Sequence, residues 1–309
     1  MRGRSKPLHL VRSLLKLAAS VCFLVSGLCF AQAGGTVPAS ADWKEVESAM
    51  GRPGQPQPGD VMKFGMPRKD LHVMLGGVTI KPALALGAWA AFKKTTDGAM
   101  VMGDLVLTED EVQPVMTKLQ EGGIQEAAIH NHLIGESPRI MYMHIASHGD
   151  AVQMAKAIHE ALALTKTPPP DATPATSADL GFDQKQVEQI LGHAGKVNGG
   201  VLQVGVPRAE SISDAGMNVP PSMGVATALN FQPTENGRAA ITGDFVLLAS
   251  EVNPVLRALR QNGIAVTALH SHMLGEEPRL LFMHFWANDD ALRLAKGLRA
   301  ALDKTNSGK

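Results

Sequence analysis

The chain has 309 residues, of which 45% are hydrophobic and 19% are charged. This composition is typical of a globular protein with room for two modest domains, and it excludes a largely disordered chain. Basic and acidic residues number 29 each, so the sequence lacks the excess positive charge that would indicate a nucleic-acid partner.

The N-terminal segment, residues 1–33, has the three parts of a secretory signal peptide. Basic residues begin it, an apolar run covers 17–30, and Ala31-Gln-Ala33 forms a small-residue cleavage pattern. The apolar run is short for a membrane span. We therefore predict cleavage near Ala33 and a secreted or periplasmic mature protein without a transmembrane helix. An uncleaved anchor is the alternative, whereas the bulky residue before Cys29 disfavours a lipidated N-terminus.

Removal of this segment changes the composition of the mature chain. Both cysteines, Cys22 and Cys29, leave with it, so a mature exported protein would depend on its core or on a metal rather than on disulfides. The segment also contains five of the 29 basic residues and none of the 29 acidic ones, which leaves 24 basic and 29 acidic residues and a formal charge of −5. This balance again predicts no nucleic-acid partner.

The remaining sequence is a tandem duplication with an offset of 140 residues. Gly65-Met-Pro-Arg68 recurs as Gly205-Val-Pro-Arg208, and the run that begins at Gly103-Asp104 recurs from Gly243-Asp244. We predict a first copy over 42–166, a linker rich in Pro, Ala and Thr over 167–180, and a second copy over 181–306. The two copies are expected to pack together as a pseudo-dimer.

The pattern of apolar residues and turn signals predicts the same elements in both copies. A short amphipathic helix opens each copy, at 43–50 and 184–191. In copy one the predicted strands are 61–64, 71–75, 78–80, 84–92 and 99–107, followed by a helix over 109–120, strands over 125–133 and 139–146, and a helix over 150–164. The predicted fold class is α+β, with two tandem copies of a mainly antiparallel sheet with packed helices.

A histidine cluster occurs in both copies between the last two predicted strands. Residues i and i+2 of a strand share a face, so His130 and His132 are expected to point the same way. If the following turn makes a hairpin of even register, His144 reaches that face from the neighbouring strand, with Cβ atoms about 5 Å apart. Three imidazoles in each copy are therefore predicted to bind a divalent metal, with zinc favoured. These ligands are His130, His132, His144, His270, His272 and His284.

Four charged residues of the same segments are candidate catalytic groups. Glu136 and Glu276 are predicted to be a general acid or base, or a further metal ligand. Arg139 and Arg279 are predicted to hold a substrate carboxylate, with an exposed ion pair to the nearby glutamate as the alternative.

Two further repeated pairs have expected structural roles. Asp104 and Asp244 each follow a glycine within a strand, where a carboxylate would orient a metal-bound histidine or mark a β-bulge. Arg68 and Arg208 stand at a strand end and are expected to form a structural ion pair.

The motifs of copy one resemble a known family. The run from Gly103 to Glu111, together with His130-Asn-His132-Leu133 and Met143-His144, resembles the LppY/LpqO family of exported bacterial proteins and lipoproteins. That family is defined largely as a domain of unknown function, so the resemblance implies export but no activity. The histidine spacing is also similar to that of acetolactate decarboxylase and of the plants-and-prokaryotes conserved domain, which implies a zinc site on an α+β fold.

Two classes of function follow from these observations. The first is an exported metal-dependent enzyme, a hydrolase or lyase that acts on a small carboxylated or ester substrate. The second is a non-catalytic exported protein that binds a metal ion or another ligand. The sequence has no G-x-S-x-G nucleophile motif and no phosphate-binding loop, so the expected partner is a small-molecule substrate or a metal ion. Histidines that only make structural hydrogen bonds are the remaining alternative.

Overall fold

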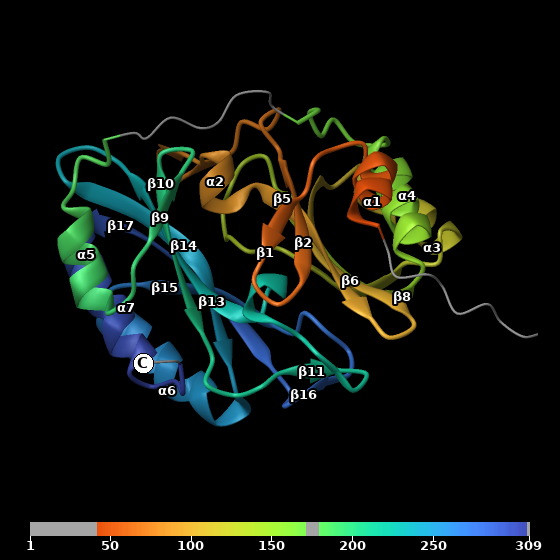
Figure 1. The fold of residues 1–309 in the computed structure, drawn as a ribbon. Coiled ribbons are helices and arrows are strands. Elements are labelled where there is room, and N and C mark those ends of the chain that lie inside the picture. The colour runs from red at the N-terminus through yellow and green to blue at the C-terminus, as the bar shows by residue number, and fades with distance from the viewer. Residues whose placement is uncertain (1–41, 171–178, 308–309) are drawn as a thin grey trace, which may run out of the picture. The chain divides into compact units, whose positions relative to one another are not determined.

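The computed structural model describes residues 42–170 and 179–307 (Figure 1). The predicted signal peptide and most of the predicted linker lie outside the described residues. All described residues belong to one compact unit, Val37–Lys309. No helix in the described part of the chain combines the length and the apolar character needed to cross a bilayer.

Copy one contains a six-stranded antiparallel sheet in the order β1-β2-β5-β6-β8-β7. Its elements are α1 (Trp43–Met50), β1 (Gln55–Gln57), β2 (Val61–Pro67), β3 (Met74–Leu75), β4 (Val78–Thr79), α2 (Pro82–Ala85), β5 (Gly87–Thr95), β6 (Gly98–Thr108), α3 (Val112–Glu121), β7 (Gln125–His130), β8 (Ile140–Gly149) and α4 (Ala151–Leu162).

Copy two repeats this topology, with strand order β15-β17-β14-β13-β10-β9. Its elements are α5 (Gln184–Leu191), β9 (Lys196–Asn198), β10 (Val201–Pro207), β11 (Ser213–Asp214), β12 (Met217–Asn218), the 3-10 helix η1 (Pro221–Met223), β13 (Ala226–Pro233), β14 (Arg238–Leu247), α6 (Ala249–Gln261), β15 (Ala265–His270), β16 (Glu276–Glu277), β17 (Leu281–Asp290) and α7 (Ala291–Leu302). The predicted α+β class with two tandem, mainly antiparallel copies is confirmed.

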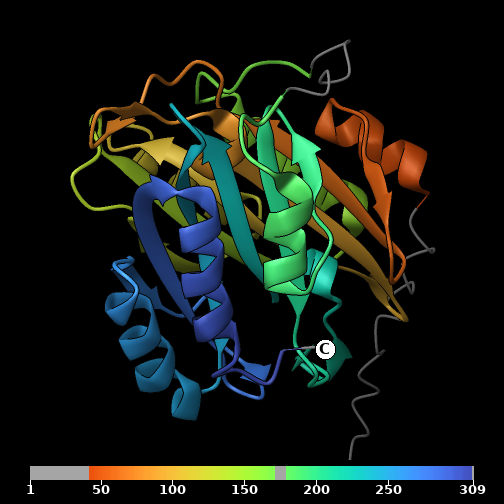
Figure 2. The same cartoon turned by 90° about the vertical axis from the view of Figure 1, so that its left-hand side faces the viewer.

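The long helices of each copy cover the outer face of its sheet. Helix α4 begins where the side chain of Asp150 accepts the backbone N–H of Gln153, and Asp290 makes the same cap for α7. Apolar residues at helical spacing, such as Met154 and Ile158, then face the sheet and are buried. Figure 2 shows α5, α6 and α7 in front of the second sheet.

The inner faces of the two sheets pack against each other. One apolar cluster combines Met102 of copy one with Met223 and Phe282 of copy two. Hydrogen bonds also cross between the copies, from the Lys81 backbone N–H to Gln232 Oε1 at 2.8 Å and from Thr267 Oγ1 to the carbonyl of His132 at 2.6 Å. The two copies therefore pack together, as the duplication predicts.

The repeated arginines form buried ion pairs. Arg68 is fully buried and contacts Asp70 and Glu111, with a bidentate pair of hydrogen bonds of 2.7 and 3.0 Å to Glu111. Arg208 makes the equivalent bonds to Glu210 and Glu251. The predicted structural role of these arginines is confirmed, since each ties the end of a strand to the start of a helix.

The structure differs from the sequence prediction around two elements. The predicted strand 84–92 begins only at Gly87, because Pro82 starts the short helix α2, a position that its fixed φ favours. The predicted helix 109–120 begins at Val112, because the Glu111 carboxylate is held by Arg68 and by the backbone N–H of Thr108 at 2.9 Å.

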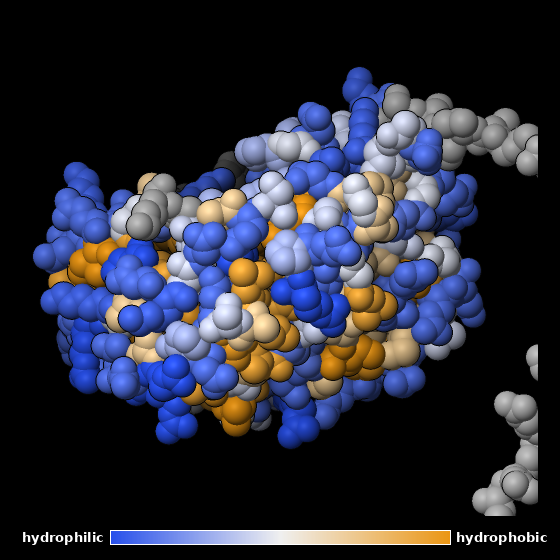
Figure 3. Space-filling view, turned by 90° about the horizontal axis from the view of Figure 1, so that it is seen from below, coloured by the Kyte–Doolittle hydropathy of each residue, from blue (hydrophilic) through white to orange (hydrophobic). Residues whose placement is uncertain are grey.

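Apolar side chains are exposed at equivalent positions of the two histidine hairpins. Ile134 and Leu274, which are 140 residues apart, are 67% and 69% exposed. Seen from below, the surface shows apolar areas separated by polar ones (Figure 3). These residues lie outside the core, and the described residues leave them uncovered.

Candidate metal centre

The register of the first sheet places an aspartate beside a histidine. Asp104 on β6 is paired with His144 on β8, and its partner on the other side is Trp89 on β5. Directly paired residues project from the same face, so all three side chains point toward the second sheet. The same row of copy two contains Ala228, Asp244 and His284.

The hairpin brings the other histidines of copy one to this face. His130 is paired with Tyr142, which is two residues before His144 on β8, so His130 and His144 share a face, as the even register predicted. Strand β7 ends at His130, and His132 lies in the bend that follows, with its Nε2 atom 3.1 Å from His130 Nε2.

Glycine precedes each aspartate for a steric reason. A Cβ atom at Gly103 would lie 2.7 Å from the carbonyl oxygen of Trp89, and one at Gly243 would overlap the carbonyl oxygen of Ala228. A larger residue would therefore push the neighbouring strand away from the row that holds the aspartate.

The histidine rings of the two copies lie against each other in pairs. Ring centroids are 3.5 Å apart for His130 and His270, 3.7 Å for His132 and His284, and 3.7 Å for His144 and His272. An aromatic ring covers each outer stack, with Tyr142 3.4 Å from His132 and Phe282 3.5 Å from His272. The six predicted ligands thus form one cluster in which every close ring pair joins the two copies.

Two sets of four histidines offer ring nitrogens close enough for one ion, all within 4.8 Å of one another. The first set is His130, His144, His270 and His272, and the second is His130, His132, His270 and His284. Each set takes two residues from each copy, and both sets include His130 and His270. The expected trio of one copy is not among the sets of the described residues, so the histidines group across the copies.

Several buried polar atoms of the cluster lack a hydrogen-bond partner. They are His130 Nδ1, His144 Nε2, His270 Nε2, His272 Nε2, His284 Nε2 and Asp104 Oδ1. Buried polar atoms of proteins are rarely left unpaired, because each costs about 1–3 kcal/mol. Five unpaired imidazole nitrogens around one point are the donor set that a divalent metal requires, so the residues fit a metal ion.

Burial keeps the imidazoles neutral. Desolvation, assisted by the neighbouring His270, lowers the pKa of His130 to about 3, and desolvation lowers the pKa of His270 to about 4. The pKa values of the other four histidines lie well below the ordinary 6.5 for the same reason, assisted by the neighbouring imidazoles. Their lone pairs are therefore available to a metal at neutral pH.

Two aspartates and a lysine lie near the histidines. Burial raises the pKa of Asp104 well above 3.8, assisted by Asp244, and burial raises the pKa of Asp244 to about 7. Burial lowers the pKa of Lys63 to about 8, against the attraction of both carboxylates. Asp104 Oδ1 is 3.9 Å from His144 Nε2, and each aspartate forms a three-residue ligand set with two histidines of its own copy.

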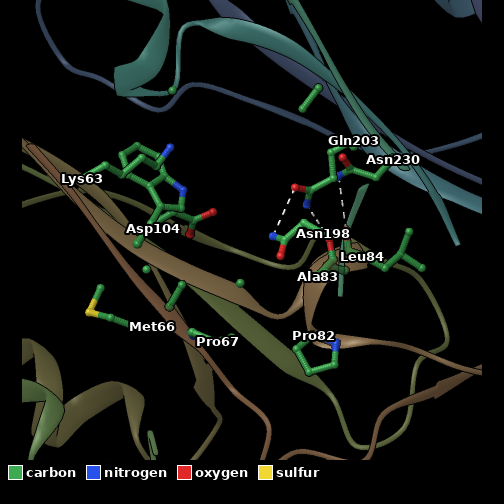
Figure 4. A pocket seen from close by; sticks show the side chains of 18 of the residues that line it. Lys63, Met66, Pro67, Pro82, Ala83, Leu84, Asp104, Asn198, Gln203 and Asn230 are labelled. Carbon is green, nitrogen blue, oxygen red and sulfur yellow. Dashed lines mark hydrogen bonds between the residues drawn. The ribbon is translucent and has the colours of Figure 1, made fainter. Parts of the chain in front are cut away.

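The cluster opens into a cavity of about 1210 Å³ between the sheets. Both copies line it, with the aspartates, His132, His144, His272 and His284 among the lining residues. Figure 4 shows Lys63 and Asp104 on one side of the cavity and Gln203, Asn198 and Asn230 on the other. A small molecule in this cavity would contact the histidines and polar side chains of both copies.

The predicted catalytic glutamates and arginines occupy the hairpin turns instead. Glu136 accepts the backbone N–H of Ile140 at 3.3 Å, and Glu276 accepts that of Leu280 at 2.9 Å. None of these glutamates and arginines lines the cavity or belongs to a ligand set of the described residues. The catalytic roles of Glu136, Arg139, Glu276 and Arg279 stay predictions.

The two arginines differ in their ion pairs. Arg279 lies 3.3 Å from the buried carboxylate of Glu276, whereas Arg139 lies 3.7 Å from the exposed Glu109. Both arginine side chains are more than half exposed, at 55% and 64%.

Sequence reasoning missed Lys63, Trp89 and Tyr142. A signal for Lys63 was present, because it stands between apolar residues of a strand, on the face that alternates with the core-facing Met62 and Phe64. Its equivalent 140 residues later is Gln203, so a comparison of the copies marks this position as polar in both.

These features define a duplicated α+β protein with a candidate metal centre shared by its copies. The chain belongs to the family described as Domain of Unknown Function (DUF1259), which matches residues 44–164 and 185–304. No curated protein matches the sequence.

Two solved structures show weak similarity. One is the trimeric bacterial microcompartment shell protein PduB, with 12% identity and a TM-score of 0.19 over 79% of this chain and 86% of that chain. The other is EtuB from Clostridium kluyveri, with 10% identity and a TM-score of 0.19 over 81% of this chain and 90% of that chain. At such TM-scores neither structure bears on the fold or the function.

Proposed function

We propose that the two copies together bind one divalent metal ion and form a metal-dependent enzyme. The observation that carries this proposal is the set of five unpaired, buried imidazole nitrogens contributed by both copies around one cavity. Nitrogen ligands of this kind favour zinc. A bound metal would polarise a substrate carbonyl or lower the pKa of a coordinated water, which suits a hydrolase or lyase that acts on a small carboxylated or ester substrate.

The two aspartates support an enzyme. Asp104 and Asp244 line the cavity, and their raised pKa values allow a carboxyl group to hold a proton near neutral pH. The set of Asp104, His132 and His144 offers three ligands, which would leave a fourth position of a tetrahedral ion for water or substrate. In this proposal the aspartates hold or move the proton, and Glu136 stabilises the hairpin that carries the histidines.

A specific observation favours the alternative, a non-catalytic protein that binds a metal or another ligand. Each four-histidine set supplies all the ligands of a tetrahedral ion, and such closed sites are typical of structural rather than catalytic zinc. Metal binding without turnover would therefore identify the chain as a binding protein.

Export is the second part of the proposal. Its support is the sequence of residues 1–33 and the resemblance of the motifs to the LppY/LpqO family, whereas the spacing shared with acetolactate decarboxylase supports the choice of zinc. Expression of the full chain with its own N-terminus, followed by mass spectrometry of the product, tests it. Cleavage near Ala33 is expected, and retention of the whole segment would contradict it.

Elemental analysis of the mature chain, purified without a histidine tag, tests the metal directly. We expect about one tightly bound divalent ion per chain, and added zinc should raise the melting temperature of chelator-treated protein. If no metal co-purifies and zinc neither binds nor stabilises the chain, the proposal fails.

A screen of small esters and carboxylates then separates the enzyme from the binding protein. An enzyme should lose turnover in Asp104→Asn or Asp244→Asn while it retains metal. The same screen with Glu136→Gln and Glu276→Gln tests the acid–base role predicted for the glutamates, because loss of turnover in those variants would favour them over the aspartates.

A further inference from the structure

The polar walls of the cavity differ between the copies although its histidines do not. Lys63 on β2 and Gln203 on β10 are equivalent residues on the inner faces of the two sheets. Lys63 Nζ donates to the carbonyl of Ser222 in η1 at 3.2 Å, and Gln203 Nε2 donates to the carbonyl of Ala83 in α2 at 2.8 Å. Each copy thus makes the same contact with the short helix of the other, but only copy one places a positive charge there.

Trp89 lies against this charge. Lys63 Nζ is 4.1 Å from the centre of the Trp89 ring, and a Cβ atom at Gly224, next to η1, would lie 2.8 Å from that ring. The indole is therefore held in place by copy two and presents its face to the ammonium group. The equivalent of Trp89 in the second sheet is Ala228, which has no such ring.

Open space adjoins these groups. Gly65 and Gly205 line the cavity, and a Cβ atom at either position would meet no atom within 4 Å. On the copy-two side, the Gln203 amide already donates to Ala83 and the Asn230 amide donates to Leu84 O at 3.3 Å. The ammonium group of Lys63 has three donors and, among the described residues, one hydrogen-bond acceptor, so it has donors left for a ligand.

The charges of the cavity favour an anionic ligand once a metal is bound. The six histidines are neutral, and the two aspartates, when ionised, would be balanced by Lys63 and half of the charge of a divalent ion. One positive charge then remains, and more remains if an aspartate holds a proton. A monoanion would neutralise this charge.

We propose that Lys63, positioned by Trp89 and Ser222, is an anion-binding subsite that takes the carboxylate of a small monocarboxylate ligand. This inference rests on the proposed function, because the other end of the ligand would reach the histidine centre. The centre is two-fold in its ligands and the subsite exists in copy one alone, so the ligand binds in one orientation. A single ammonium group suits a carboxylate better than a phosphate, which usually takes several converging donors.

The chain itself supplies the matched variants. Lys63→Gln introduces the residue that copy two has at the equivalent position, so the hydrogen bond to Ser222 can be kept while the charge is lost. Gln203→Lys places a charge at the equivalent position of copy two. The double variant Lys63→Gln/Gln203→Lys keeps the total charge and moves the cation to the other side.

Calorimetric titration of the zinc-loaded and metal-free full chain with acetate, and separately with inorganic phosphate, tests the subsite. We expect Lys63→Gln to weaken acetate binding about 10-fold or more, as loss of a hydrogen bond to a charged group does, and to leave zinc affinity within about 2-fold. The double variant should recover acetate binding only in part, because Ala228 replaces Trp89 beside the new cation.

The outcomes separate this inference from the proposed function. Acetate binding equal to that of the unmodified chain in Lys63→Gln would overturn the subsite, and tighter binding of phosphate than acetate would overturn the carboxylate assignment. A chain that binds no zinc but whose metal-free form loses acetate affinity in Lys63→Gln would refute the metal proposal and retain the subsite.

Discussion

The two copies supply the same ligands but different surroundings. Asp104 and His144 of copy one occupy the row that Asp244 and His284 occupy in copy two, whereas Lys63 corresponds to Gln203. A centre built equally by two copies should respond alike to the same change in either. A ligand that contacts the differing wall should instead respond to changes in copy one alone.

The largest effect is expected at the two histidines common to both ligand sets. The double variant His130→Ala/His270→Ala removes two ligands from each set of four, so metal binding should fall by far more than the 10–100-fold typical of outer partners of a metal site. Equilibrium dialysis against zinc measures this. His130→Ala and His270→Ala alone should weaken binding equally, and a large difference between them would contradict a shared centre.

Mild acid should destabilise the metal-free protein. Each buried histidine has a folded-state pKa below its unfolded value of about 6.5, so unfolding takes up protons and the free energy of unfolding falls as the pH drops below 6.5. The loss continues to about pH 4 and pH 3, the pKa values of His270 and His130. Asp104 and Asp244 act in the opposite direction, since burial raises their pKa values.

Because the six histidines outnumber the two aspartates, the net slope is positive, on the order of a few kcal/mol per pH unit at its steepest. Urea unfolding of chelator-treated protein between pH 7 and pH 5 checks this slope. Variants that lack one histidine of copy one or its equivalent in copy two should show equally reduced slopes, and a flat profile would show that the histidines are not buried neutral groups.

Loss of either aspartate carboxylate should have a smaller effect. Asp104→Asn and Asp244→Asn leave the histidines in place but remove a charge beside them, so zinc affinity should fall about 10–100-fold, as is typical for groups that orient or support ligands. Competition with a chelator of known affinity measures the change. An effect confined to one aspartate would show that the metal belongs to one copy.

The smallest effects are expected at the hairpin arginines. Arg139 pairs only with an exposed glutamate, so Arg139→Ala should change the free energy of unfolding by about 0–1 kcal/mol. Arg279→Ala should cost more within the same range, because Arg279 also donates to the carbonyl of Leu274 and to Ser271 Oγ. Thermal unfolding of both variants tests this order. Loss of substrate binding in either variant would support the predicted role as a carboxylate clamp.

Much of the fold could be predicted from local sequence. The offset of 140 residues between repeated motifs gives the duplication, and the spacing of His130 and His144 around a turn gives the hairpin face, because both depend on chain geometry that is local. The segment that begins at Pro82 was predicted as part of a strand, since its apolar residues do not distinguish a buried strand from a short helix.

The arrangement of the histidines between copies could not be predicted. It depends on how the inner faces of two sheets pack, as in the contact of Thr267 with the carbonyl of His132, and residues 135 positions apart give no periodic signal. The wall of the cavity was equally hidden, because Lys63 becomes a functional candidate only once Ser222 and Trp89 are seen beside it.

A comparison of two double variants tests the shared centre most directly. His144→Ala/His272→Ala damages only the first four-histidine set, and His132→Ala/His144→Ala damages both. Zinc stoichiometry and affinity of each variant are measured by calorimetry. The account predicts that the first variant keeps a tight site and the second loses it. If instead the second variant keeps a tight site and the first loses it, each copy binds metal by itself and the account is wrong.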